Sequence, residues 1–345
     1  MSRLPVGWLC TIALAAIHVG RAHADASKLE GTHSTYVEQA PVVDSASRHK
    51  PRGNNTGRIH EELPLSFGLD LVLGFGKTPV MTTLPSATPG YGQQARVLET
   101  AHVMTQSLVL VGSYETSERM GFGVRWPLTF GTASPSAFTP RSVFAMGNVE
   151  LEGDYVLPLA SHARITFVLG VALPTAQGRE VPSHEELRHE QVTDPAHELD
   201  RGSIQRAADS LRGFEDEALF ELHRVGIVPK VALDYRLGKF LLRPYAKLEN
   251  LFSTEGADMV AHPVVVEVVL ATYLGLTVND AIDLGARFWG DFALVGNGPT
   301  VAVVEPQLSA HIGHVGLAIG GIWPFAGGLT RTQFGGVRAL ISAHI

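Results

Sequence analysis

Apolar and polar positions alternate along residues 146–175 of the chain. One parity holds bulky apolar residues such as Tyr155, and the other holds the carboxylates Glu150, Glu152 and Asp154. This period of two predicts strands, because successive side chains of a strand point to opposite sides of the pleat. We therefore predict a β-hairpin whose two faces meet two different solvents.

The same period recurs along the chain and predicts twelve strands. They cover residues 65–76, 96–114, 119–131, 146–157, 162–175, 218–236, 239–252, 262–275, 281–294, 300–312, 315–325 and 333–345. Their connections alternate between long and short, as in outer-membrane barrels, which have short periplasmic turns and longer extracellular loops. The predicted fold is all-β: a transmembrane antiparallel up-and-down β-barrel of about 12 strands, of the Gram-negative outer-membrane type.

The N-terminal residues have the features of a secretory signal peptide. Arg3 precedes an apolar stretch at 6–19, and Ala22-His23-Ala24 fits a cleavage site, so we predict a signal peptide at 1–24 that is cleaved near Ala24. The apolar stretch is too short to span a bilayer as a helix. The only cysteine, Cys10, lies within this segment, so disulfides do not stabilise the mature chain.

Two further segments lack the strand period. Residues 25–63 are polar and predict a flexible periplasmic leader ahead of the barrel at 64–345. Within the barrel, residues 175–217 predict a long extracellular loop, in which 203–212 fit a short helix. This loop is long enough either to cap the mouth of the barrel or to fold inward as a constriction.

The charge balance argues against a nucleic-acid partner. The chain has 27 basic and 34 acidic residues, a formal net charge of −7, and no block of basic residues. We expect the partners to be outer-membrane lipid, the barrel-assembly machinery and a small-molecule solute.

Short motifs in the hairpin region carry a resemblance to a known family. They are Gly147-Asn148-Val149-Glu150-Leu151, Trp126-Pro127-Leu128 and Leu173-Pro174-Thr175. They resemble the outer-membrane family named for the meta-pathway of phenol degradation, although Asn148 replaces an Asp and Ala176 replaces a final Gly. The resemblance, which is strongest over 105–175, implies an outer-membrane barrel that passes small molecules, including hydrophobic or aromatic ones.

Motifs for catalysis or for cofactors are incomplete. Gly74-Phe75-Gly76-Lys77-Thr78 lacks the leading glycine of a phosphate loop, because that position holds Leu71. His184 and His189 are five residues apart and diverge on a helix, so with His197 they predict a solvated loop rather than a metal site. We expect no cofactor, no metal and no catalytic residue. A hydrolase with a site on the barrel rim is the enzyme alternative, but the chain has no G-x-S-x-G motif.

The charged parity of the strands predicts the residues that line the lumen. They are Arg125, Glu150, Glu152, Asp154, Arg164, Lys230, Asp234, Arg243, Lys247, Glu249, Asp283, Arg287 and Asp291. These charges either pair across strands or line water. The predicted function is a channel for the passive passage of small molecules. The alternative is a structural or partner-binding barrel without a solute path.

Overall fold

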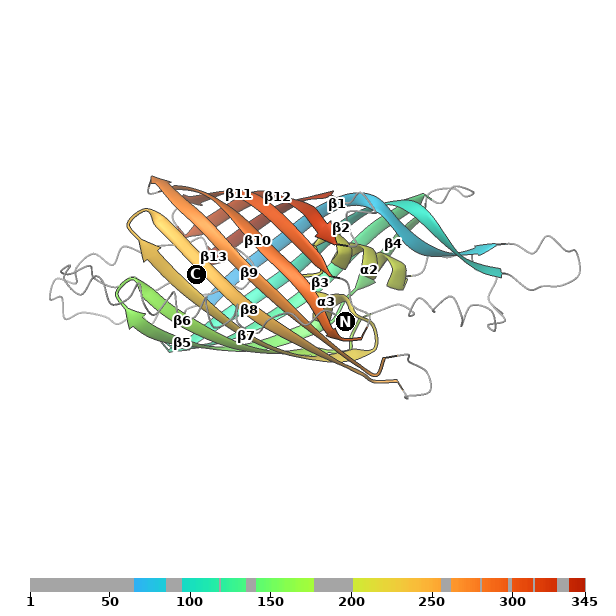
Figure 1. Cartoon of the computed structure of the whole chain (residues 1–345), viewed down its shortest axis with the longest axis horizontal. Coiled ribbons are helices and arrows are strands. Elements are labelled where there is room, and N and C mark those ends of the chain that lie inside the picture. Colours follow the sequence, from blue (N-terminus) through green and yellow to red (C-terminus); the bar gives the residue numbers. More distant parts are fainter. Residues whose placement is uncertain are drawn as a thin grey trace, which may run out of the picture. The chain divides into compact units, whose positions relative to one another are not determined.

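The computed structural model describes residues 65–84, 95–117, 119–134, 141–176, 201–255, 262–279, 281–296, 300–312, 314–327 and 335–344. In this part of the chain, 13 strands form one antiparallel sheet that closes on itself (Figure 1). Two of them, β4 and β5, are halves of one wall strand, because both pair with β3 and only Gly147 and Asn148 separate them. The wall is therefore the 12-stranded barrel that the alternation predicts. The predicted signal peptide and leader lie outside the described residues.

The strands follow one another around the wall in sequence order. They are β1 (Leu65–Leu84), β2 (Ala95–Ser117), β3 (Met120–Ser134), β4 (Arg141–Met146), β5 (Val149–Ala160), β6 (Ala163–Leu173), β7 (Arg224–Leu237), β8 (Phe240–Ser253), β9 (Val264–Asn279), β10 (Ile282–Val295), β11 (Val301–Ile312), β12 (Val315–Gly327) and β13 (Gly335–His344).

Pairing of the first strand with the last closes the barrel. β1 pairs with β13 from Ser66↔His344 to Phe75↔Gly335. Beyond Phe75, β1 continues paired with β2 alone as far as Leu84↔Ala95, so this hairpin extends past the closed wall. Closure leaves no unpaired edge, which a hydrocarbon environment requires of any sheet that crosses it.

The alternation of connection lengths is confirmed. Five hairpins turn through only the two residues between their strands, at 118–119, 161–162, 238–239, 280–281 and 313–314. The intervening connections are longer, and the longest joins β6 to β7 across residues 174–223. All the short turns therefore lie at one end of the barrel, which we call the turn end, and the other is the loop end.

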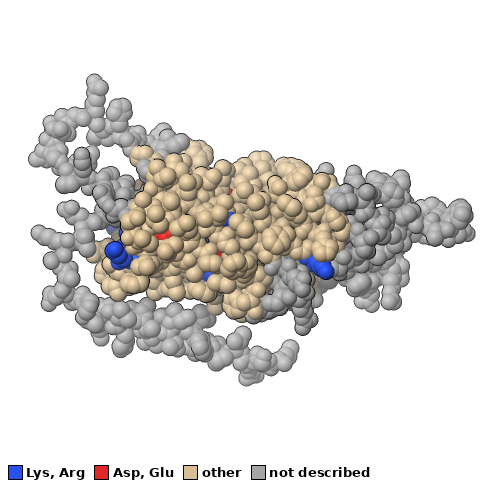
Figure 2. All heavy atoms as spheres, turned by 90° about the horizontal axis from the view of Figure 1, so that it is seen from above, with Lys and Arg blue, Asp and Glu red and all other residues tan. Residues whose placement is uncertain are grey.

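The two faces of the wall have opposite chemistry. Outward side chains are large and apolar, and Phe167 and Leu169 keep 47% and 54% of their surface exposed, whereas Glu150 keeps 2%. The face in Figure 2 is accordingly almost free of charged side chains where residues are described. This wall fits a lipid surround, with polar groups turned to the interior. The described helices include none with the length and apolar character needed to cross a bilayer.

One predicted strand differs from the structure. Residues 218–236 were expected to form a single strand, but α3 (Glu217–Phe220) occupies the beginning of that range and β7 starts at Arg224. Leu219 and Phe220 are both buried, in a cluster with Val109 of the inner wall. An apolar run that is enclosed on all sides needs no alternation, so periodicity alone does not separate it from a strand.

The facing of β5 is tested by cysteine substitution. Because Glu152 points inward and Tyr155 outward, Glu152→Cys should react only with small water-soluble reagents, and Tyr155→Cys only with lipid-phase probes. Mass spectrometry of the folded protein in bilayers measures both yields. Lipid-phase labelling at position 152 together with aqueous labelling at position 155 would reverse the assignment.

Candidate functional site

Two short helices lie inside the barrel, α2 (Arg201–Leu211) and α3 (Figure 1). We call residues 201–222 the plug. The helix predicted at 203–212 is confirmed as α2. Of the two placements considered for the 175–217 segment, its described part takes the inward one, because α2 contacts β1, β2, β3 and β4 and residues 204–211 are buried except for Arg206. The plug therefore fills a lumen that twelve strands enclose.

The apolar stripe of α2 explains why it docks on the wall. Ile204, Ala207, Ala208 and Leu211 follow the i, i+3, i+4, i+7 spacing of one helix face, and none is more than 2% exposed. Each packs on inner-wall side chains, among them Val303 beside Leu211. The inner wall at this level is thus apolar, which is unusual for a barrel lumen.

Glycines in the wall let α2 approach closely. A Cβ on Gly74 of β1 would lie 2.7 Å from the Cβ of Leu211, and one on Gly131 of β3 would lie 2.7 Å from a methyl carbon of Ile204. Both distances are shorter than van der Waals contact, so a side chain at either position would require the facing residue of α2 to shift.

Asp216 connects the plug to two wall strands by ion pairs. Its carboxylate lies 2.9 Å from Arg125 of β3, 3.6 Å from Lys247 of β8 and 3.2 Å from Arg212 of the plug itself. Arg125 also pairs with Glu150 at 2.8 Å. The neighbouring residue, Glu215, turns to other strands.

Glu215 pairs with two arginines of the wall. Its carboxylate lies 2.6 Å from Arg287 of β10 and 3.2 Å from Arg338 of β13, and Tyr245 donates a hydrogen bond to it. Its backbone carbonyl accepts a hydrogen bond from Lys247. Glu215 and Asp216 therefore share β8, and between them they also bind β3, β10 and β13.

Buried charges of the wall complete the network. Asp70 of β1 accepts hydrogen bonds from Arg212 and from Arg338, whose Nε lies 2.8 Å away. Arg287 reaches Glu305 at 2.6 Å. We call the whole set the ionic belt: Asp70, Arg125, Glu150, Arg212, Glu215, Asp216, Lys247, Glu249, Arg287, Glu305 and Arg338.

Glu215 and Asp216 are both ionised when the plug is docked. Burial by itself raises the pKa of Asp216, but Arg125, Lys247 and Arg212 outweigh it and hold that pKa well below its usual value. Glu215 follows the same pattern, because Arg287 and Arg338 overcome burial and lower its pKa. Glu215 and Asp216 are therefore both charged at neutral pH.

Three of the predicted lumen residues form a separate group at the turn end. The carboxylate of Asp234 lies 2.8 Å from Arg164 and 2.6 Å from Arg243. In the same region, Asp283 lies 3.0 Å from the His311 ring.

The remaining predicted residues have individual surroundings. Glu152 lies 3.5 Å from Arg125, and the Lys230 ammonium lies 4.4 Å from the centre of the Tyr245 ring. Asp154 is half-buried beside Gly121. The others join the ionic belt, except Asp291, which lies in an acidic cluster with Glu217 and Glu267.

The prediction included the wall residues Arg125, Lys247 and Arg287 but missed other residues that hold the plug. Arg212, Glu215 and Asp216 lie in a stretch without period, where nothing local indicates a long-range partner. The prediction also missed the belt residues Asp70, Glu305 and Arg338. Each is a charged residue at an inward position of a largely apolar strand, and that position was the signal in the sequence.

The motif that resembles the phenol-pathway family anchors α3. Asn148 donates its side-chain amide to the carbonyl oxygens of Ala218 and Glu221, at 2.9 and 2.7 Å, and accepts from the Ala176 N–H at 2.8 Å. Thr175 Oγ1 donates to the carbonyl of Gly147 at 3.1 Å. The break between β4 and β5 is therefore where the wall binds the plug backbone.

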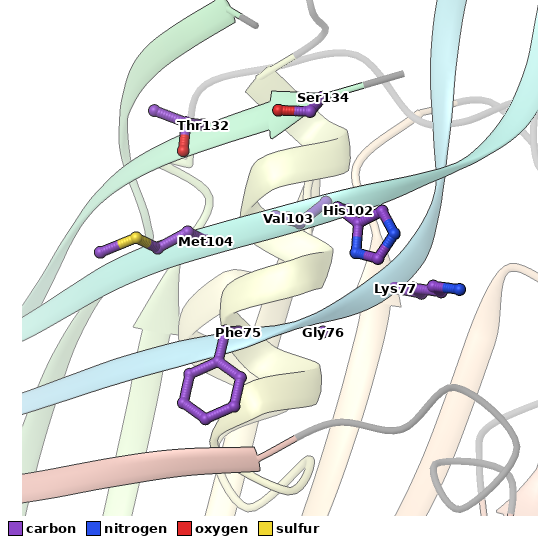
Figure 3. Close-up of a pocket in the computed structure, with 8 residues that line it drawn as sticks. All are labelled: Phe75, Gly76, Lys77, His102, Val103, Met104, Thr132 and Ser134. Carbon is purple, nitrogen blue, oxygen red and sulfur yellow. The ribbon is translucent and has the colours of Figure 1, made fainter. Parts of the chain in front are cut away.

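A pocket of about 340 Å³ lies on the outer side of the barrel near the loop end, where β1, β2 and β3 meet. Phe75 and Met104 project into it, with His102 and Lys77 beside them, and α2 lies behind the strands (Figure 3). Phe75 and Met104 are 62% and 52% exposed, so this pocket belongs to the outer surface and not to the lumen.

Comparison with known proteins establishes a likeness of fold. No protein-family model matches the sequence, and no curated protein sequence matches it. An outer membrane channel from Pseudomonas putida F1 is similar in structure, with a TM-score of 0.51 and 11% identity over 84% of this chain and 100% of that one. The translocator domain of the autotransporter NalP from Neisseria meningitidis has a TM-score of 0.40 and 9% identity, covering 83% and 90%. The P. putida toluene transporter TodX has a TM-score of 0.37 and 9% identity, covering 92% and 98%.

Removing the Asp216 charge should release the plug. Asp216→Asn leaves Arg125 and Lys247 buried with one partner fewer, which costs on the order of 3 kcal/mol and raises the exposed fraction of the plug roughly a hundredfold. Trypsin cleavage after Arg212, which is fully buried in the docked state, measures that fraction. Asp234→Asn breaks a comparable pair away from the plug and should leave the cleavage rate unchanged. Equal cleavage rates in Asp216→Asn and Asp234→Asn would contradict the role of Asp216 in holding the plug.

Acid should undock the plug only at low pH. A carboxyl group whose folded-state pKa is lowered stabilises the fold above its unfolded pKa, and that contribution is lost as pH falls through the folded pKa. Docking through Glu215 and Asp216 should therefore persist in mild acid and weaken below about pH 4. Cleavage by an acid-active protease across this range, with Asp216→Asn for comparison, provides the measurement.

Replacing Asn148 should destabilise the docked plug. Asn148→Ala leaves buried carbonyl groups of α3 without donors, which costs about 1–3 kcal/mol for each unsatisfied group. We expect a lower urea midpoint for plug release and faster cleavage after Arg212. The control is Asn250→Ala, which removes a single exposed hydrogen bond to Ile227. If both variants behave like the unaltered protein, the anchor has no energetic role.

Proposed function

We propose that this protein is an outer-membrane channel for the passive passage of small hydrophobic or aromatic molecules through its lumen. The observation that carries the proposal is the apolar inner wall beside α2, where Val269, Trp289 and Val303 are buried against the plug. A solute without hydrogen-bonding groups would find there an apolar surface to pack against.

The plug is attached in a way that lets it move without any covalent bond being broken. The ionic belt holds the plug by buried ion pairs, and the desolvation of such pairs offsets much of their attraction. A displaced plug whose charges regain water is therefore not far above the docked state in free energy. The proposal requires two states of the plug, with the solute path open in the displaced one.

The location in the outer membrane rests on the apolar exterior and the closed sheet, and the proposed partners are outer-membrane lipid and the barrel-assembly machinery. A solved outer membrane channel shares the fold, and the motif around Gly147 resembles a family associated with phenol degradation. Both support transport rather than catalysis, and the motif favours an aromatic solute.

A reversible tether between plug and wall tests the proposal. The Cβ positions at Gly74 and Leu211 are 2.7 Å apart, about 1 Å closer than in an average disulfide. Because Leu211 is the last residue of α2, a small movement of the helix end can supply the missing distance. Gly74→Cys with Leu211→Cys should, when oxidised, reduce solute uptake to that of cells without the protein. Reduction should restore uptake. The predicted mature chain has no cysteine of its own to interfere.

The assay needs intact Gram-negative cells, because small hydrophobic molecules cross plain phospholipid unaided. We would measure uptake of radiolabelled toluene by a host strain that lacks general porins. Leu211→Cys alone should transport equally under oxidising and reducing conditions. Full uptake by the oxidised pair would contradict a lumenal path. No uptake above background by the unaltered protein would contradict the channel and favour a structural or partner-binding barrel.

A further inference from the structure

Three buried carboxylates meet where α3 contacts the inner wall. They belong to Glu217 of α3, Glu267 of β9 and Asp291 of β10, which are 7%, 1% and 0% exposed. One oxygen from each lies within 4.8 Å of the other two. This arrangement brings three acidic groups from three elements to one point away from solvent.

These carboxylates differ from every other acidic group that holds the plug. Glu215 and Asp216 each contact basic side chains, and Glu249 beside the cluster is bound to Lys247 at 2.7 Å and to the Ala218 N–H at 2.8 Å. By contrast, both oxygens of Glu267, both oxygens of Asp291 and Oε2 of Glu217 accept no hydrogen bond from a side chain outside the cluster among the described residues, and their polar contacts are with one another and with the Phe292 N–H.

A fourth acidic group increases the imbalance. Asp209 of α2 is 4% exposed, and its Oδ1 also has no partner among the described residues. Isolated buried carboxylates cost several kcal/mol each by desolvation alone. A cation or bound protons have to offset that cost, because no basic side chain in the described part of the chain forms an ion pair with Glu217, Glu267 or Asp291.

We propose that Glu217, Glu267 and Asp291 bind a divalent cation, of the calcium or magnesium class, that fastens α3 to the wall. Hard divalent cations prefer carboxylate oxygens, and the absence of sulfur and imidazole from the set disfavours zinc and copper. Two oxygens that coordinate one Ca²⁺ at about 2.4 Å lie no more than about 4.8 Å apart, and the three oxygens of the cluster meet that limit.

The position of the site gives the cation a structural role. Glu217 begins α3, and Ala218 and Glu249 join the same helix to β8 by the hydrogen bond described above. A cation shared with β9 and β10 would therefore attach the plug to the wall at a point separate from the ionic belt. This inference does not depend on which solute the barrel passes.

Binding of Ca²⁺ and of Mg²⁺ to the folded full-length barrel in detergent, after removal of metals by chelator, tests the proposal. Isothermal titration calorimetry at neutral pH should find one site per chain. Asp291→Asn and Glu217→Gln should each weaken binding by about tenfold or more, because affinity follows the number of charged ligands. Asp283→Asn, a wall carboxylate paired with His311, is the matched control and should bind as the unaltered protein does.

Heat-modifiable gel mobility establishes that each variant is folded. Because Glu217→Gln changes no wall residue, this variant keeps the test valid if Asp291→Asn misassembles. Trypsin cleavage after Arg212 should slow when the cation is added to the unaltered protein, and not in Asp291→Asn. The proposal is overturned if neither cation binds at millimolar concentration, or if Asp291→Asn and Glu217→Gln bind as tightly as Asp283→Asn. An infrared band of protonated carboxyl groups at neutral pH that Asp291→Asn removes, without cation binding, would show that protons neutralise the cluster instead.

Discussion

Hydrogen bonding between β1 and β13 is the constraint from which the other features of the barrel follow. In hydrocarbon, every backbone N–H and C=O must be paired within the protein, and only a closed sheet achieves this with strands. Closure fixes an inside and an outside, and the period of two assigns each side chain to one of them. The lipid-facing residues then become apolar, and the charged residues can only point into a lumen of limited width.

The narrow lumen favours pairing of the charges that it encloses. Twelve strands enclose more space than wall side chains alone fill, but too little for bulk water around every charge. The plug adds Arg212, Glu215 and Asp216 as further partners of wall residues that also pair with one another. The same segment covers the apolar part of the inner wall with α2. One segment therefore satisfies both the polar and the apolar regions of the interior.

Local sequence predicted the elements that obey a period, and it could not predict contacts across the lumen. The strands, the alternation of turns and loops, and α2 all follow from spacing within a few residues. The pairing of Asp70 with Arg338 spans most of the chain and depends on closure. The belt carboxylates Glu215 and Asp216 have no periodic neighbours, and the apolar run before β7 has the same composition whether it forms a strand or α3. The anchor at Asn148 was visible only as a family resemblance, because its partners lie about seventy residues away.

The adjacency of Glu215 and Asp216 determines how the plug can leave. Glu215 binds β8, β10 and β13, and Asp216 binds β3 and β8, so strands from several parts of the ring hold two consecutive residues. Moving either carboxylate pulls its neighbour through the backbone, and one set of ion pairs cannot break without straining the other. The charges should therefore separate together, which favours two discrete positions of the plug over gradual displacement. The side chains that fill the lumen thus also make its opening cooperative.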